Sequence, residues 1–255
     1  VEGPLALRMQ RLDAAREGST GRQILTLPLL AARLAGGFIA PASQEILYPA
    51  IREALEAGGF EDIGKVSDLP GMPSAVLSAL RSWWDAGVQE SIPDNARLRD
   101  FIVLERRVRE ALPPGTLAPP DLAEAALRRL KLAPRLIGPV TIHEVPDIRP
   151  VWRGLIGQLC DVVPVRWVAP PHSRWSWFPG QKEMLPARSS VLTTVDVCAD
   201  PRSEVREALR WARARIIEDR IPPSEIAITA ASPRTWDDTF LVLAREARLP
   251  LHFSH

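Results

Sequence analysis

The apolar positions of residues 28–132 recur at the three- and four-residue spacing of amphipathic helices. One helical face of residues 43–57 carries Ile46, Leu47, Ala50, Ile51, Ala54 and Leu55. Further helices are expected over residues 4–16, 28–34, 74–86, 95–112 and 122–132. No run typical of a strand interrupts residues 28–132, and one short strand is expected before them, at 23–27. The pattern therefore predicts a large and mainly helical segment.

The pattern changes at residue 139, where short apolar runs begin to alternate with helical spacing. The runs predict strands at 139–145, 163–169, 190–197, 225–230 and 250–254. The segments between them predict helices at 148–160, 203–219 and 234–247. Strands that alternate with helices in this way form parallel sheets with right-handed crossovers. The sequence therefore predicts an α/β fold.

This change of pattern also predicts two lobes. The first lobe spans residues 1–188 and holds a parallel sheet, with residues 28–132 as a helical insertion. The second lobe spans residues 189–255, and the proline-containing run at 178–188 is the expected hinge. The chain begins without Met and stops inside a predicted strand. We therefore interpret it as part of a longer protein, with a truncated second lobe.

Composition narrows the class of protein. A hydrophobic content of 46% in 255 residues is enough for a packed core. The net charge of +1 does not by itself indicate a nucleic-acid binder or a membrane-surface protein. No apolar run reaches the roughly 18 residues of a membrane span, and the N-terminus lacks the pattern of a signal peptide. A cytoplasmic protein without membrane contact is expected.

Cysteine and histidine usage gives no support for a metal site. Cys160 and Cys198 are too few for a disulfide framework or a four-cysteine zinc site, and both are expected to be buried free thiols. The four histidines lack the spacing of zinc ligands. No metal is therefore expected.

Candidate catalytic residues are few. A phosphate loop needs Gly-x-x-x-x-Gly-Lys-Ser/Thr, and the nearest glycine-rich segment, at 17–22, lacks the Lys and the spacing. Glu144, at a predicted strand end, is either a vestigial general base or a carboxylate that meets an arginine. His143 stands beside it, although imidazole suits softer metals than Mg²⁺. No nucleophile or pair of carboxylates is evident, so no catalytic residue is predicted.

Two groups of residues are suited to nucleic acid. Arg174 precedes the run Trp175-Ser176-Trp177-Phe178, whose aromatic rings either stack on bases or pack in a loop between domains. Arg206, Arg210 and Arg213 lie at spacings of four and three on one helical face. That face either is solvated or contacts phosphates. Both alternatives stay open for each group.

Two segments resemble motifs of superfamily 1 helicases of the UvrD type. In that family a hydrophobic strand ends in Asp-Glu-x-Gln-Asp, which positions Mg²⁺ and water. The corresponding segment here reads His-Glu-Val-Pro-Asp, so His143, Glu144 and Asp147 occupy vestigial catalytic positions. The next family motif aligns without a gap on residues 168–180. Its matching residues are Val168, Phe178 and Gly180, whereas its Asp and Gln positions hold Pro170 and Ser173.

Other segments extend the resemblance. Residues 198–208, 221–228 and 249–253 resemble the opening of the second motor domain of UvrD-like helicases. Residues 24–34, 68–72 and 79–87 are similar to AddB-type proteins, which join an inactivated helicase region to a C-terminal nuclease. The resemblance implies a P-loop-NTPase-like parallel sheet with a helical insertion, followed by the start of a second RecA-like lobe.

The same resemblance implies a function. The chain would be a non-catalytic scaffold of a helicase–nuclease for double-strand-break repair and recombination, with no cofactor of its own. Its partners would be single-stranded DNA or duplex ends and an AddA-type helicase subunit. The expected DNA contacts are Arg174, Trp175, Trp177, Arg206, Arg210 and Arg213. One alternative is an active ATP-dependent helicase lobe, using ATP and Mg²⁺, whose phosphate loop lies outside this chain. The other is a protein-interaction module without DNA binding.

Overall fold

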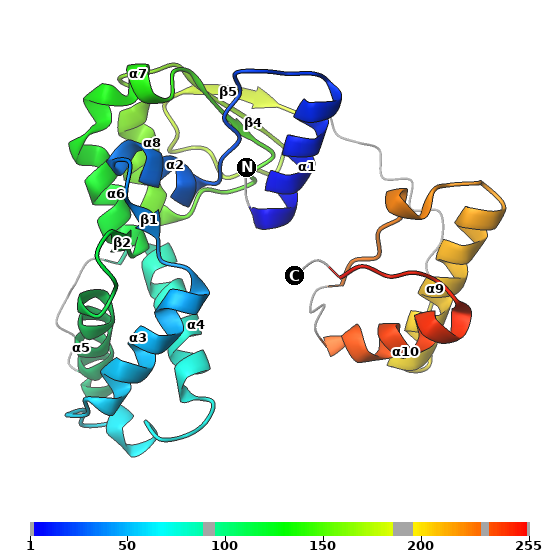
Figure 1. The fold of residues 1–255 in the computed structure, drawn as a ribbon, viewed down its shortest axis with the longest axis horizontal. Helices are drawn as coiled ribbons and strands as arrows, with labels where there is room; N and C mark the ends of the chain where they lie inside the picture. Colours follow the sequence, from blue (N-terminus) through cyan, green and yellow to red (C-terminus); the bar gives the residue numbers. More distant parts are fainter. Residues whose placement is uncertain (1–2, 89–94, 186–195, 231–234, 254–255) are drawn as a thin grey trace. The chain divides into compact units, whose positions relative to one another are not determined.

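The computed structural model describes residues 3–88, 95–185, 196–230 and 235–253 (Figure 1). The chain has a mixed α/β fold that is mostly helical, with one two-stranded and one three-stranded parallel sheet. It forms two compact units, unit 1 at Val1–Ala187 and unit 2 at Arg188–His255. Within the described residues, no helix is long and apolar enough to cross a membrane.

The three-stranded sheet of unit 1 has β4 (Val165–Ala169) at its centre, between β3 (Val140–His143) and β5 (Gln181–Met184). Helix α8 (Pro150–Leu159) connects β3 to β4, and both strand pairs are parallel. Strand β4 is buried except at Arg166, as expected for a strand covered on both faces. The predicted strands at 139–145 and 163–169, and the helix between them, are confirmed.

Strand β5 was not expected from the sequence. Its four residues are all exposed, and three of them are polar or charged, so they give no apolar pattern. The strand forms because its backbone pairs with β4. Gly180, which precedes it, has no side chain, so the backbone can approach β4 closely. A Cβ at Gly180 would lie 2.6 Å from the carbonyl oxygen of Val165. The prediction of a hinge at 178–188 is therefore wrong for residues 178–185, because Phe178 is buried and β5 follows it. Residues 186–188 lie outside the described ranges.

The helices of unit 1 divide between two apolar cores. One core lies between the sheet, α8 and the helices α2 (Leu27–Ala35), α6 (Pro119–Arg128) and α7 (Ala133–Leu136). The other lies within a bundle of α3 (Gln44–Glu56), α4 (Met72–Ala86) and α5 (Ala96–Glu110), which we call the helical bundle. The other helices described in unit 1 are α1 (Gly3–Arg16) and the 3₁₀ turns η1 (Ile63–Lys65) and η2 (Leu130–Leu132), which add Ile63 to the core of the bundle and Leu130 to the core at the sheet. Only part of the predicted helical insertion is thus separate from the sheet (Figure 1).

Two short strands connect the helical bundle to the rest of unit 1. Strand β1 (Ala40–Pro41) pairs in parallel with β2 (Thr116–Leu117). The expectation that no strand interrupts residues 28–132 is therefore wrong, because two-residue strands are too short to leave an alternating pattern. The strand expected at 23–27 is also absent, since residues 22–26 are irregular and α2 begins at Leu27.

A buried carboxylate fixes the connection between α3 and α4. The side chain of Asp100 on α5 accepts hydrogen bonds from the backbone N–H groups of Glu61 (3.0 Å), Asp62 (2.6 Å) and Ile63 (2.9 Å). These are donors at the start of η1, which no helical carbonyl satisfies. Asp100 is only 8% exposed, whereas a charged residue of an amphipathic helix ordinarily lies on its exposed face.

Unit 2 is built on α9 (Pro201–Ile217) and α10 (Asp237–Ala247), which pack through Val205, Leu209, Leu243 and Ala244. The side chain of Asp200 caps α9 by accepting a hydrogen bond from the backbone N–H of Ser203 (2.8 Å). The helices predicted at 203–219 and 234–247 are confirmed over most of their length.

The strands predicted for unit 2 are not formed in the residues described. Residues 196–197, 226–230 and 249–253 are irregular, and Glu225 ends the 3₁₀ turn η3 (Pro223–Glu225). The positions 190–195 and 254 lie outside the described ranges. A strand needs a hydrogen-bonding neighbour as well as an apolar run, and the described residues of unit 2 provide no such neighbour.

Candidate nucleic-acid interface

The carboxyl ends of β3 and β4 lie side by side because the two strands are parallel. The loops that leave them, at 144–149 and 170–180, therefore meet at one edge of the sheet. Glu144 donates its N–H to the carbonyl of Val168 (2.8 Å), and Arg174 donates its N–H to the carbonyl of Pro146 (2.9 Å). Ligand sites of parallel sheets occur at this edge. The backbone thus places the two sequence-predicted groups of unit 1 next to each other.

The three vestigial positions have different surroundings. His143 is half-buried, and its buried Nδ1 has no hydrogen-bond partner among the described residues. Glu144 is exposed and has a left-handed backbone, with φ of 54°. Asp147 forms an ion pair with Arg153 of α8 (3.1 Å), and Arg153 also donates to the carbonyl of Ile148 (2.8 Å). In the described part of the chain, no three His, Cys, Asp or Glu side chains gather as metal ligands would.

The aromatic residues after Arg174 pack around the buried indole of Trp167 on β4. Its ring centroid lies 6.0 Å from that of Trp175, 5.8 Å from that of Trp177 and 5.3 Å from that of Phe178. The contacts with Trp175 and Phe178 are edge-to-face, which is a favoured arrangement of aromatic rings. Trp167 also donates its Nε1–H to the carbonyl of Val145 (2.8 Å). Trp167 therefore holds both loops against the core, one through its hydrogen bond to Val145 and the other through its ring contacts.

This packing restricts what the aromatic loop can offer to a base. Trp175 and Trp177 are both half-buried, whereas Arg174 is exposed. The guanidinium of Arg153 lies over the ring of Trp177, 5.3 Å from its centroid, so a base has only the opposite face for stacking. The part of this loop best placed for nucleic acid is the guanidinium of Arg174, with the outer parts of the two indoles beside it.

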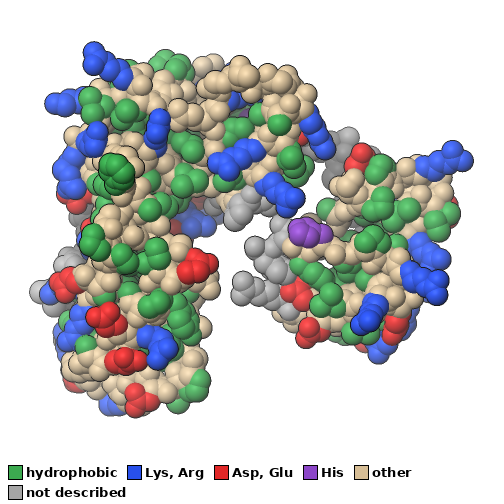
Figure 2. Space-filling view, in the orientation of Figure 1, with side chains coloured by type: hydrophobic (Ala, Val, Ile, Leu, Met, Phe, Trp, Pro, Cys, Tyr) green, Lys and Arg blue, Asp and Glu red, His purple; other side chains and the backbone are tan. Residues whose placement is uncertain are grey.

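The arginine face of α9, defined by Arg206, Arg210 and Arg213, is exposed. Arg210 forms an exposed ion pair with Glu207 (2.6 Å), a type of pair that contributes little to stability. No carboxylate of the described residues lies within ion-pair distance of Arg206 or Arg213. Figure 2 shows several Lys and Arg side chains along the edge of unit 2 that α9 forms. Two of the three guanidinium groups are thus available to phosphates.

Two exposed residues of unit 2 were missed from the sequence, Arg248 beside the arginine face and Trp211 on another side of α9. Arg248, at the end of α10, lines an open hollow of about 400 Å³ together with Arg213. Trp211, between Arg210 and Arg213 in sequence, is 48% exposed. An aromatic residue that follows an arginine and lies off the apolar stripe of its helix is the signal that would have identified Trp211. No local pattern indicates Arg248, because it reaches α9 only through the packing of the two helices.

The structure therefore brings the candidate residues together in two separate groups. Arg174, Trp175 and Trp177 lie beside the vestigial positions at the sheet edge of unit 1, and the arginine face of α9 belongs to unit 2. Cys160 and Cys198 are free and half-buried, so the expectation of full burial is wrong for both. A scan against protein-family models and a search of curated proteins find no match to the chain.

Proposed function

We propose that this chain is a non-catalytic, helicase-like scaffold of a helicase–nuclease that processes double-strand breaks, and that it contacts DNA and an AddA-type motor subunit. The observation that carries the proposal is the arginine face of α9, which is exposed and whose Arg213 lines the same hollow as Arg248. Guanidinium groups on one helical face suit contact with a phosphate backbone rather than with a particular base sequence.

The architecture of unit 1 supports the helicase-like part of the proposal. Strand β3, helix α8 and strand β4 form one parallel crossover unit, of the kind from which P-loop-NTPase sheets are built. The resemblance to UvrD-type helicases assigns the Mg²⁺ and water positions to the end of β3. Asp147, the last residue of the corresponding motif, forms an ion pair with Arg153. An ion-paired carboxylate is a poor ligand for a metal, which favours a scaffold over an active motor.

The alternative of an active helicase lobe is tested by ATP turnover. We expect no Mg²⁺-dependent ATP hydrolysis by this chain, with or without single-stranded DNA, because it lacks a phosphate-loop Lys and has His143 where a hard ligand is needed. ATP should also leave the melting temperature unchanged, since a ligand that binds only the native state raises it. Saturable turnover in a purified sample would favour the active lobe instead.

We expect DNA binding to be weak, indifferent to sequence and steeply dependent on salt. Replacing Arg206, Arg210 and Arg213 by Ala should flatten the slope of log K against log salt by about 0.7 for each phosphate of a single strand that the protein no longer neutralises. Fluorescence anisotropy with a labelled oligonucleotide over a range of salt concentrations measures this slope. Ala at Arg16, Arg52 and Arg128 is the matched control, since these three exposed helical arginines are ion-paired.

The outcomes separate the three functions. An unchanged slope in the α9 triple variant would remove the arginine face as the DNA contact, and the Arg174→Ala variant would then test the aromatic loop. A complete lack of DNA binding at low salt would favour the protein-interaction module. Binding that the control triple weakens as much as the α9 triple would show that total charge, and not the arginine face, determines the affinity.

A further inference from the structure

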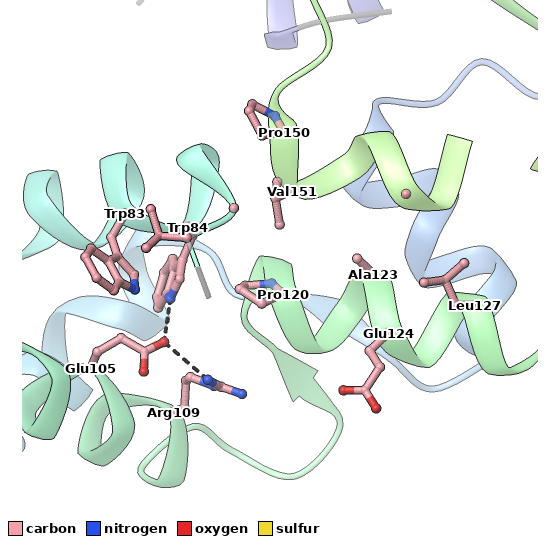
Figure 3. Close-up of a pocket in the computed structure, with 13 residues that line it drawn as sticks. Trp83, Trp84, Glu105, Arg109, Pro120, Ala123, Glu124, Leu127, Pro150 and Val151 are labelled. Atoms are coloured by element: carbon pink, nitrogen blue, oxygen red, sulfur yellow. Dashed lines mark hydrogen bonds and ion pairs between the residues drawn. The ribbon is translucent and has the colours of Figure 1, made fainter. Parts of the chain in front are cut away.

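A cavity of about 330 Å³ lies where the helical bundle meets the sheet-bearing part of unit 1. Its walls come from α4 and α5 of the bundle and from α6 and α8 of the other core. In Figure 3, Trp84, Glu105 and Arg109 lie on one side, and Ala123, Leu127, Pro150 and Val151 lie on the other. This volume is at the lower end of the range of about 300–1,000 Å³ for small-molecule sites, so the cavity suits a compact ligand.

Glu105 is a buried carboxylate with an unused oxygen. Its residue is 4% exposed, and its Oε1 accepts hydrogen bonds from Trp84 Nε1 (2.7 Å) and Arg109 Nη1 (3.4 Å). No described residue donates a hydrogen bond to Oε2, and this oxygen remains in contact with solvent. A buried carboxylate is costly unless its charge and its lone pairs are satisfied. The cavity wall therefore has an acceptor that still lacks a cationic donor of its own.

Arg109 does not supply that donor, because it is shared with a second carboxylate. Its Nε donates to Asp121 (2.8 Å), and its Nη2 also binds Asp121. Burial by itself would lower the pKa of Arg109, but the hydrogen bonds and charges of Asp121 and Glu105 outweigh it and raise this pKa above its ordinary value. One positive charge thus faces two carboxylates, so the three side chains together have one more acidic group than basic groups.

The remaining walls are apolar or aromatic. Glu124 also lines the cavity, but it is paired with Arg128 (2.7 Å) and both side chains are exposed. Ala123, Leu127 and Val151 offer aliphatic contacts. Trp83 and Trp84 add aromatic rings to the lining, and the Nε1–H of Trp84 is directed at Glu105. An excess negative charge inside an apolar and aromatic cavity is complementary to a cation that has a short hydrocarbon stem.

We propose that this cavity binds a primary alkylammonium group, with its head at the Glu105 carboxylate and its stem along the apolar wall that α6 and α8 form (Figure 3). The ligand is either a free amine or the lysine side chain of a partner protein, since both present the same chemistry. The proposal does not depend on DNA binding and goes beyond the scaffold function. It assigns a ligand site to the contact between the helical bundle and the sheet-bearing core.

The test is a calorimetric titration of the whole chain with n-butylammonium, with 1-butanol and butyrate as matched uncharged and anionic probes. Saturable binding is expected for the cation alone. Glu105→Gln keeps an acceptor for Trp84 Nε1 but removes the charge, and should weaken binding by about 10- to 100-fold, the effect of losing one hydrogen bond to a charged group. Equal binding of 1-butanol, or an unchanged affinity in Glu105→Gln, would overturn the proposal.

Two glycines of α8 provide a control that leaves every charge in place. A Cβ at Gly154 or at Gly157 meets no atom within 4 Å, so the backbone accepts a side chain at both positions. Gly154 lines the cavity, whereas Gly157 does not. Gly154→Leu should therefore reduce butylammonium binding at least tenfold, and Gly157→Leu should leave it unchanged. Equal effects of the two variants would place the binding site elsewhere.

A peptide separates the two sources of the cation. A short Ala- and Gly-based peptide with one central Lys is titrated in parallel with n-butylammonium. Tighter binding of the peptide supports a partner's lysine as the ligand, and binding of butylammonium alone supports a free amine. If neither probe shows saturable binding to the folded chain, the cavity is not a cation site.

Discussion

Trp167→Ala is expected to lower the free energy of unfolding of unit 1 by about 3–5 kcal/mol. Trp167 is fully buried on the central strand, and three aromatic rings pack against it. The truncation leaves a cavity at the sheet edge and a carbonyl at Val145 without its indole donor. Trp175 and Trp177 lose their common support, so the loop that carries Arg174 should also become more accessible to proteases.

Urea denaturation followed by tryptophan fluorescence measures this loss of stability, and two further variants serve as comparisons. Trp167→Phe keeps a ring in the core but loses the bond to Val145, so its cost should be smaller, at about 1–3 kcal/mol. Trp211→Ala removes an indole that is 48% exposed in unit 2 and should cost less than about 1 kcal/mol. A cost for Trp167→Ala no greater than that of Trp211→Ala would contradict the central role of Trp167.

Asp100→Ala is expected to destabilise unit 1 by about 3–4 kcal/mol at neutral pH. Its carboxylate accepts three backbone N–H bonds at the start of η1, and hydrogen bonds to charged groups each contribute about 1.5–3 kcal/mol. The estimate lies below the full sum because the N–H groups of Glu61 and Asp62 can bind water after the change. Urea denaturation at pH 7 measures the loss, and Asp68→Ala, which changes an exposed carboxylate, is the control.

The same carboxylate predicts a dependence on pH. Burial by itself would raise the pKa of Asp100, but the three N–H groups outweigh it and hold this pKa below its ordinary value. A lowered pKa means that the stabilisation is complete above the unfolded pKa of about 3.9 and disappears as pH falls through the folded pKa. The difference in stability between the unchanged chain and Asp100→Asn should therefore shrink below about pH 4. A difference that stays constant down to pH 2 would contradict this origin.

The sequence predicted those elements whose buried faces leave a pattern of apolar residues. Strands β3 and β4 and helix α8 were predictable because apolar residues mark their buried faces. Strand β5 was not, because its exposed side chains leave no such mark and only its backbone holds it to β4. The apolar run Ile226-Ala227-Ile228 produced the opposite error. It predicted a strand at 225–230 that does not form, because an apolar pattern does not supply a neighbouring strand.

The candidate site was predictable to a similar extent. The sequence placed Arg174, Trp175 and Trp177 in a loop after β4, and parallel pairing brings that loop to the end of β3. It did not predict that Arg153 binds both Asp147 and the ring of Trp177, because α8 contacts them only in the folded chain. Glu105 was missed for the same reason. Its charge suggests the surface, although it lies on the apolar side of α5 with Leu104 and Val108, and Trp84 of another helix donates a hydrogen bond to it.

The pairing of β1 with β2 has a consequence for how the helical bundle relates to the rest of the protein. The chain enters the bundle after Ala40 and Pro41 and returns through Thr116 and Leu117, which lie directly opposite them. Backbones of paired strands are only about 4.8 Å apart, so the chain enters and leaves the bundle at neighbouring points. The other described links of the bundle to the rest of unit 1 are made by side chains, such as the pair of Arg109 with Asp121. Entry and exit points this close together mean that a change in the length of the bundle need not move the strands of the sheet, so we expect the backbone at this point to tolerate such changes.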